Sequence, residues 1–280
     1  GIRPASRPSR ELPSALGGVE DLLRETAGRH PVLFLDYDGT LTPIVEDPAR
    51  ASLTEPMRAA LRDLARHFTV SIVSGRDLQD VRGLVGLEGI TYAGSHGFEI
   101  AGPGEDALDQ QKGEEFLPDL DGAQAALEKE LDAIAGAVVE RKHYSIAVHW
   151  RNAREEDEPA VEDAVDRVKQ DHPRLRKSRG KKIFELQPDI DWNKGRALLW
   201  ILDTLDLAGP DRLPIYIGDD TTDEYAFGAL RMRNDGGMGI LVAGEERFTE
   251  AQHRLEDPEE VRAFLERLSS RARDLGVAGG

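Results

Sequence analysis

The chain has 280 residues, and its 36 Lys and Arg against 53 Asp and Glu give a formal net charge of −17. Such a negative charge repels nucleic acids and anionic membranes, so we expect neither as a partner. There is no cysteine, which excludes disulfides, thiolate zinc sites and cysteine nucleophiles. No apolar stretch has the length of a membrane span or the form of a signal peptide. We therefore expect a cytoplasmic protein, and a monomer.

The first third of the chain changes from an irregular opening to alternating strands and helices. Residues 1–18 are rich in Pro, Ser, Gly and Arg and lack periodicity, which predicts a flexible tail. The apolar run Val32–Leu35 is typical of a parallel strand covered on both faces. A helix signal begins at Thr54. The β-rich run FTVSIVSGR follows and ends in Ser74 and Gly75.

The middle of the chain has a different pattern. Helical periodicity occurs at about 120–134 and again at about 158–170. Between them lies ERKHYSIAVHWR, whose apolar and polar residues alternate as in a strand with one buried face. KKIFEL is predicted to form a further strand. These features indicate a small α+β unit with an antiparallel sheet.

The last third returns to the first pattern. LPIYIGDD contains an apolar strand, Ile215–Ile217, and a helix is predicted after Asp257 and Pro258. We therefore predict an α/β protein with a doubly wound, Rossmann-like parallel-sheet core, formed by residues 19–103 and 188–280. An α+β cap of residues 104–187 is inserted into this core.

Three predicted strands end in polar residues: LFLDYDGT, SIVSGR and IYIGDDTTDE. Ligands of open parallel sheets lie beyond the carboxyl ends of the strands, so these ends should converge. The aspartates Asp36, Asp38, Asp219 and Asp223 then become candidates for one small volume. Two carboxylates about 4 Å apart repel by about 4 kcal/mol at an effective dielectric constant near 20. A hard cation with oxygen ligands, Mg²⁺, would relieve that repulsion.

In chain order, DYDGT, VSGR, a Lys-containing segment and GDDTTDE resemble the four motifs of the haloacid-dehalogenase-like phosphatases. The wider segments LDYDGTLTPIVEDPARA, AGSHGFEI, ERKHYSIAVHWR, QPDIDWNKGRAL and IYIGDDTTDEYAF resemble one branch, the trehalose-6-phosphate phosphatases. The similarity extends from about Pro31 to Leu268. This resemblance implies Mg²⁺-dependent hydrolysis of trehalose 6-phosphate to trehalose and phosphate, a step of trehalose biosynthesis.

The resemblance also implies roles for the aspartates. Asp36 would be the nucleophile that forms an aspartyl-phosphate, and Asp38 the general acid and later the general base. The carboxylates of Asp36 and Asp219 and the backbone carbonyl of Asp38 would bind Mg²⁺. Asp223 would hold a metal-bound water or orient its neighbours.

Three further residues of the motifs are expected to bind the phosphoryl group. Ser74 would donate its hydroxyl and Gly75 its backbone N–H. Lys194 would neutralise the charge of the aspartyl-phosphate.

The cap is expected to select the sugar, because the four motifs serve every substrate of the superfamily alike. Five cap residues match the sugar-binding pattern of the trehalose-6-phosphate phosphatases: Glu140, Lys142, Arg151, Lys181 and Glu185. Lys181 and Glu185 are four residues apart and would share one face of a strand. A bulge would instead bring Lys182 to that face.

Other functions are compatible with the same motifs. The enzyme could act on sucrose, glucosylglycerol or mannosylglycerate phosphate, since only the cap discriminates among sugars. A phosphomutase would use the same core motifs. A non-catalytic regulator that binds sugar phosphate would be expected to lack the nucleophile or the motif lysine, whereas Asp36 and Lys194 are both present.

Overall fold

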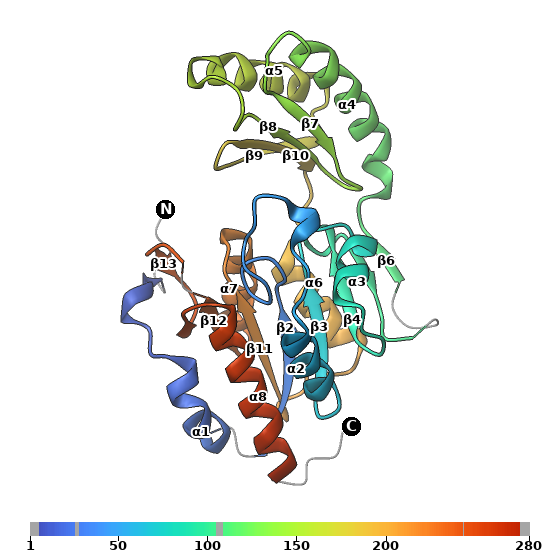
Figure 1. Cartoon of the computed structure of the whole chain (residues 1–280). Helices are drawn as coiled ribbons and strands as arrows, with labels where there is room; N and C mark the ends of the chain where they lie inside the picture. The colour runs from blue at the N-terminus through green and yellow to red at the C-terminus, as the bar shows by residue number, and fades with distance from the viewer. Residues whose placement is uncertain (1–5, 26–27, 105–108, 243, 275–280) are drawn as a thin grey trace. The chain divides into compact units, whose positions relative to one another are not determined.

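The computed structural model describes residues 6–25, 28–104, 109–242 and 244–274 (Figure 1). The chain divides into two compact units, residues 1–110 with 192–280 and residues 111–191. We had expected the inserted segment at 104–187. The assignment of the two units as a catalytic core and a specificity cap stays a prediction.

The first unit is built on an eight-stranded sheet in the order β14-β12-β11-β2-β3-β4-β5-β6. All pairings from β14 to β4 are parallel, and β5 is antiparallel to β4. The strands are β2 (His30–Leu35), β3 (Thr69–Val73), β4 (Thr91–Gly94), β5 (Glu99–Ala101), β6 (Asp109–Gln111), β11 (Arg212–Gly218), β12 (Met238–Val242) and β14 (His253–Leu255). A second, two-stranded sheet joins β1 (Arg7–Pro8) to β13 (Phe248–Thr249).

Helices cover both faces of the large sheet (Figure 1). On one face the core includes α1 (Ala15–Glu25), α2 (Glu55–Ala65), α3 (Leu78–Val85) and α8 (Pro258–Asp274). On the other face it includes α6 (Lys194–Thr204) and α7 (Glu224–Met232). Within β2, Leu33 and Leu35 belong to the first cluster, while Val32 and Phe34 belong to the second. This alternation confirms the predicted strand with two buried faces and the doubly wound core.

Short sequence signals set the starts of these helices. The Thr54 hydroxyl accepts a hydrogen bond from the Met57 N–H at 3.3 Å, and Pro56 lies in the first turn of α2. The Asn193 side chain accepts from the Arg196 N–H at 3.0 Å, so α6 begins at Lys194. The described part of the chain also contains short 3-10 helices at Ser9–Glu11, Pro48–Arg50, Ser95–Gly97, Glu114–Phe116, Glu155–Asp157 and Thr221–Asp223.

The second unit is a four-stranded antiparallel sheet in the order β7-β8-β10-β9. Its strands are β7 (Val138–Arg141), β8 (Ile146–His149), β9 (Leu175–Gly180) and β10 (Ile183–Pro188), and its helices are α4 (Leu117–Leu131) and α5 (Glu158–Asp171). The two helices pack on one face, in a core that includes Ile146, Val148 and Trp150. The predicted apolar face of Ile146, Val148 and Trp150 is therefore confirmed, but burial does not alternate along the strand, because Ala147 on the other face is also buried.

Two expectations about local structure are wrong. Residues 6–18 do not form a flexible tail: β1 pairs with β13, and Leu12 and Ala15 are each 3% exposed. The prediction failed because these two buried apolar residues stand singly in a Pro- and Ser-rich segment and give no periodic pattern. In KKIFEL, the strand begins only at Ile183, because Gly180 pairs with Ile183 and the two lysines form the turn between them. Residues 1–5 lie outside the described residues.

Among the described residues, none of the helices combines the length and the apolar character needed to cross a membrane.

The packing of α8 generates a first prediction. Phe264 is completely buried among residues from the sheet and from neighbouring helices. Phe264→Ala should lower the free energy of unfolding by about 3–5 kcal/mol, because it leaves a cavity in the core. Urea titration followed by circular dichroism measures this change. Ser270→Ala, on the exposed side of the same helix, should change it by less than about 0.5 kcal/mol. Equal effects of the two substitutions would contradict the packing.

Candidate active site

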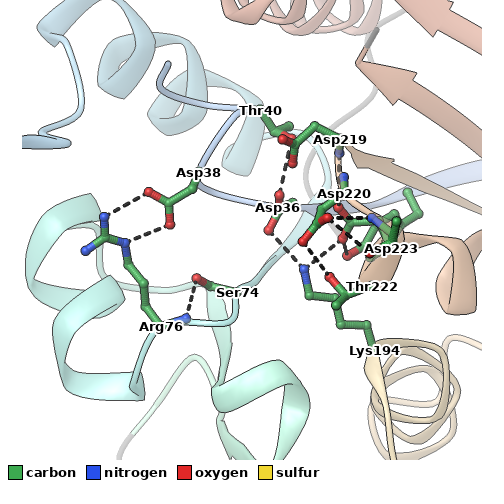
Figure 2. Close-up of polar contacts among 12 residues, drawn as sticks. Asp36, Asp38, Thr40, Ser74, Arg76, Lys194, Asp219, Asp220, Thr222 and Asp223 are labelled. Atoms are coloured by element: carbon green, nitrogen blue, oxygen red, sulfur yellow. Dashed lines mark hydrogen bonds and ion pairs between the residues drawn. The ribbon is translucent and has the colours of Figure 1, made fainter. Parts of the chain in front are cut away.

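Three neighbouring strands bring polar residues that are distant in sequence to one edge of the first unit's sheet. β11, β2 and β3 lie side by side and run parallel. Asp36 follows β2, Ser74 follows β3 and Asp219 follows β11. Because the carboxyl ends of parallel strands share an edge, these residues gather there. Figure 2 shows the resulting cluster.

Three carboxylates form the centre of the cluster. One oxygen from each of Asp36, Asp219 and Asp223 lies within 4.8 Å of the others. Burial, with the nearby Asp223, raises the pKa of Asp36 well above its usual range. Burial likewise raises the pKa of Asp219, to about 6. In both cases burial is the largest cause, and repulsion from the Asp223 carboxylate adds to it.

Lys194 supplies the positive charge inside the cluster. Its Nζ donates to Asp36 Oδ1 at 3.2 Å and to Asp223 Oδ1 at 2.8 Å. The residue is 3% exposed. Burial alone would lower the pKa of Lys194, but the two carboxylates outweigh it and raise the pKa above its usual value. Lys194 is therefore a fixed cation at the first turn of α6.

Asp223 is fully committed to hydrogen bonds within the site. The Tyr216 hydroxyl donates to Asp223 Oδ1 at 2.5 Å, and the backbone N–H groups of Asp219 and Asp220 donate to Oδ2 at 3.0 and 2.9 Å. Burial would raise the pKa of Asp223, but Lys194 and these hydrogen bonds lower it. The side chain is thus held ionised, and it fixes the backbone that carries Asp219.

Asp219 has an oxygen available for a cation. Its Oδ1 is buried and has no hydrogen-bond partner in the described part of the chain. The other oxygen, Oδ2, lies where Gly39 leaves room: a Cβ on Gly39 would come within 2.0 Å of it, and the glycine has φ +79°. An unpartnered buried oxygen beside two other carboxylates is a donor set that fits a hard cation such as Mg²⁺.

The Asp38 carboxylate lies apart from these three. It faces Arg76, whose Nε and Nη2 donate to its two oxygens at 2.8 Å each (Figure 2). Arg76 also bonds Asp80 at 3.0 Å and the Pro48 carbonyl at 2.8 Å. The expectation that all four aspartates share one small volume therefore holds for three side chains but not for that of Asp38. The pairing with Arg76 is bidentate, which fixes the direction of the Asp38 carboxylate.

Ser74 and Gly75 form a tight turn after β3. The Ser74 hydroxyl accepts the Arg76 N–H at 3.0 Å, and Ser74 is 1% exposed. A Cβ on Gly75 would come within 2.5 Å of the His96 ring. His96 also donates its backbone N–H to the Ser74 carbonyl at 2.8 Å. Packing against this turn is the role that the structure gives to His96.

In the second unit, the face of the sheet away from the helices carries the predicted sugar-binding carboxylates. Glu140 and Glu185 both pair with Ala147 in the register, so all three side chains lie on this open face. Glu140 contacts the His149 ring at 3.3 Å. Glu185 Oε1 is buried and has no hydrogen-bond partner among the described residues. The two predicted acidic residues thus flank Ala147 on one face, with β8 between their strands.

The two lysines of the β9–β10 turn are distinguished by their contacts. Lys182, with φ +60°, donates to Glu155 at 3.2 Å and lies 4.2 Å from the centre of the Trp150 ring. Trp150 belongs to the core beneath the helices, so Lys182 is directed to the helix side of the sheet. Lys181 is exposed in the turn, so the expectation that it shares a strand face with Glu185 is wrong.

The two remaining predicted cap residues lie at ends of strands. The Lys142 N–H donates to the Ser145 carbonyl at 2.9 Å, in the connection from β7 to β8. Arg151 is exposed in the turn that follows β8.

A family model described as trehalose-phosphatase matches residues 34–259. This range contains the Asp36, Lys194 and Asp223 cluster and the whole second unit. The chain belongs to the trehalose-phosphatase family. It is therefore a phosphatase, a phosphoric monoester hydrolase.

Individual relatives agree with the family. The chain is 44% identical to the trehalose 6-phosphate phosphatase RA3 of Zea mays, over 92% of this chain and 75% of that protein. It is 42% identical to trehalose-phosphate phosphatase B of Arabidopsis thaliana, over 92% of this chain and 71% of the relative.

Solved structures share the fold. The crystal structure of a trehalose-6-phosphate phosphatase related protein superposes with a TM-score of 0.74 at 25% identity, covering 87% of this chain and 99% of that one. The C-terminal domain of the trehalose-6-phosphate phosphatase of C. albicans has a TM-score of 0.74 at 22% identity, covering 92% and 98%.

Sequence reasoning missed two residues of this phosphatase site. Arg76 stands in the recognised VSGR motif, two residues after Ser74, and that position was the available signal. Tyr216 lies inside the apolar strand before Asp219, where it resembles any buried core residue. Burial, with the nearby Asp223, raises the pKa of Tyr216 well above its usual value, so its hydroxyl remains a donor.

The Arg76–Asp38 pair leads to a second prediction. Arg76→Ala should lower kcat about 10- to 100-fold, because a charge-assisted bidentate contact of about 1.5–3 kcal/mol no longer directs Asp38. Arg76→Lys should recover only part of kcat, since an ammonium lacks the planar fork. Steady-state phosphate release measures both. Asp80→Asn removes a different partner of Arg76 and should change kcat by less than about twofold. Unchanged kcat in Arg76→Ala would show that the pair is not needed.

Proposed function

We propose that this chain hydrolyses trehalose 6-phosphate to trehalose and inorganic phosphate, in an Mg²⁺-dependent reaction that passes through an aspartyl-phosphate on Asp36. The observation that supports the proposal most directly is the buried Lys194 ammonium, 3.2 Å from Asp36. A carboxylate alone would repel a phosphoryl dianion. A preorganised cation beside it offsets the charge that develops during phosphoryl transfer.

In the first step, an oxygen of Asp36 attacks phosphorus, and the bond between phosphorus and the sugar oxygen breaks. The electron pair leaves with the sugar oxygen, which takes a proton from Asp38. In the second step, water attacks phosphorus and gives a proton to Asp38. The bond from phosphorus to Asp36 then breaks, and the carboxylate is restored. The contact with Arg76 in Figure 2 would set the position from which Asp38 gives and takes this proton.

The remaining residues of the site would bind the phosphoryl oxygens. Ser74 would donate its hydroxyl, Gly75 its backbone N–H and Lys194 its ammonium. The carboxylates of Asp36 and Asp219 and the backbone carbonyl of Asp38 would hold Mg²⁺, and Asp223 would orient Asp219. When bound, Mg²⁺ supplies positive charge that lets the carboxylates and the phosphate lie close together.

The second unit would select the sugar. A disaccharide offers many hydroxyls, and a site rejects the wrong sugar when its own buried polar groups stay unpaired. The unpartnered Glu185 oxygen is such a group. We assign sugar binding to five residues of this unit: Glu140, Lys142, Arg151, Lys181 and Glu185. A monomer in the cytoplasm remains our expectation for the enzyme.

Phosphate release from a panel of sugar phosphates tests the function. The panel holds trehalose, sucrose, glucose and mannosylglycerate phosphates, each with Mg²⁺ and with a chelator. We expect kcat/KM for trehalose 6-phosphate to exceed the others by at least about tenfold, and activity to vanish with chelator. Asp36→Asn should abolish turnover, because an amide cannot act as the nucleophile.

Other outcomes of this panel are informative. Mg²⁺-dependent activity with another preferred sugar would support the motif chemistry and contradict the sugar assignment. Folded wild-type protein without any activity would favour the regulator that binds sugar phosphate.

The two turn lysines provide a matched test of sugar binding. Lys181→Ala should raise KM for trehalose 6-phosphate about tenfold with little change in kcat, because a contact to bound sugar is lost. Lys182→Ala should leave KM unchanged and lower the melting temperature, since Lys182 is paired with Glu155 and Trp150. The opposite result, with KM raised only by Lys182→Ala, would assign the sugar contact to the other lysine.

A further inference from the structure

Residues 247–250, between β12 and β14, contact the loop that carries Asp219 and Asp223. Arg247 Nη2 donates to the Asp220 carbonyl at 3.0 Å. This carbonyl lies next to the N–H groups that Asp223 accepts. Within this loop, the Asp219 and Asp220 N–H groups therefore donate to the Asp223 carboxylate, and the Asp220 carbonyl accepts from Arg247.

The same segment also contacts the residue that ends the loop. Glu224 directly follows Asp223 and opens α7. Its carboxylate accepts the Thr249 hydroxyl at 2.7 and 2.9 Å and the Glu250 N–H at 2.9 Å. Thr249 is 1% exposed, and its Oγ1 in turn accepts the Ala251 N–H at 3.1 Å. Residues 247–250 thus fasten the loop at both ends.

The N-terminal segment holds this fastening strand in place. Arg7 pairs with Thr249 and Pro8 with Phe248 in the two-stranded sheet. The Ser9 N–H donates to the Arg247 carbonyl at 2.8 Å, and the Arg247 N–H donates to Ser9 Oγ at 3.1 Å. Ser9 is 4% exposed. Segments 238 residues apart are therefore joined beside the site, although neither belongs to the large sheet.

We propose that residues 7–9 and 247–250 form a clasp that positions the Asp219–Glu224 loop for binding of the divalent cation and for catalysis. Arg247 and Thr249 are the positioning residues of this clasp. They act through the Asp220 carbonyl and the Glu224 carboxylate and do not touch substrate. The inference rests on the proposed function only in its cation and catalytic parts. The part that concerns only the position of the loop stands on the hydrogen bonds and the strand pairing described above.

The clasp would affect cation binding because the unpartnered Asp219 Oδ1 must be held in a fixed position to act as a ligand. The loop is short: its Asp219 and Asp223 side chains lie near Asp36 and Lys194 in Figure 2, and its Asp220 carbonyl accepts from Arg247. A shift of about 1 Å in a catalytic group is enough to cost about a hundredfold in rate. Without the hydrogen bonds from Arg247 and Thr249, the loop should therefore keep its backbone fold, but the Asp219 carboxylate should no longer be held in one position.

A pair of substitutions at Thr249 separates the hydroxyl from the packing. Thr249→Val keeps the shape of the side chain but removes the hydroxyl that donates to Glu224 and accepts from Ala251, whereas Thr249→Ser keeps this hydroxyl. For Thr249→Val we expect about tenfold weaker Mg²⁺ binding by calorimetry, with kcat reduced and KM for the sugar phosphate unchanged. Thr249→Ser should retain wild-type values. Arg247→Gln should act like Thr249→Val, and Arg262→Gln, a matched arginine on α8, should change neither quantity.

Hydrogen exchange without metal provides a readout that does not depend on the phosphatase reaction. Backbone amides of residues 218–225 should exchange about tenfold faster in Thr249→Val than in Thr249→Ser. Ser9→Ala should show a smaller change in the same direction. If exchange and Mg²⁺ binding are equal in the two Thr249 variants, the clasp does not position the loop. A lower melting temperature in Thr249→Val with unchanged Mg²⁺ binding and kcat overturns the positioning role as well.

Failure of the proposed function would look different. Wild-type protein that neither binds Mg²⁺ nor releases phosphate would refute the proposed function and the cation part of the inference. Hydrogen exchange in the same variants would still decide whether the clasp holds the loop.

Discussion

The contact of Lys194 with Asp36 and Asp223 is the interaction on which the site depends. An uncompensated buried carboxylate costs several kcal/mol, and this site holds two buried carboxylates and a half-buried one, with one oxygen of each within 4.8 Å of the others. One ammonium cannot neutralise three carboxylates. Burial, together with the Asp223 carboxylate, raises the pKa of both Asp36 and Asp219. The protein therefore stores a deficit of positive charge at the place where a cation and a phosphate would meet.

The fold explains how such an unfavourable cluster is maintained. Each carboxylate stands at the end of a buried strand or in the turn after it, and helices pack an apolar cluster onto each face of the sheet. Asn193 caps α6 so that Lys194 begins the helix, and Tyr216 reaches Asp223 from within β11. The stability of the two apolar clusters allows the site to remain strained electrostatically.

Charge pairing also separates residues of similar chemistry. Asp38 differs from Asp36 by two positions, yet Arg76 draws its carboxylate away from the cluster. Lys181 and Lys182 are adjacent, yet only Lys182 lies against Trp150 and Glu155. In the first pair the two carboxylates have different cationic partners, Lys194 for Asp36 and Arg76 for Asp38.

Much of the fold could be predicted because it follows local patterns. The apolar runs before Asp36, Ser74 and Asp219 specified parallel strands, and parallel strands place their ends at one edge. In the second sheet, the alternation around Ile146 and Val148 predicted which side chains of β8 face the helices. The opening segment could not be predicted in this way. Its anchors are single residues, Leu12 and Ala15, and its strand partner lies far along the chain.

By itself, the sequence determined which residues follow which strands, and so the positions of Asp36, Lys194 and the acidic loop after Ile217. Those properties depend on order and on the period of side chains along a strand, which are local. Only the tertiary structure decided that Asp38 faces Arg76, that Tyr216 serves Asp223, and that residues 7–9 meet residues 247–249. These contacts depend on side-chain rotation and on the approach of distant segments, which carry no periodic signal in the sequence.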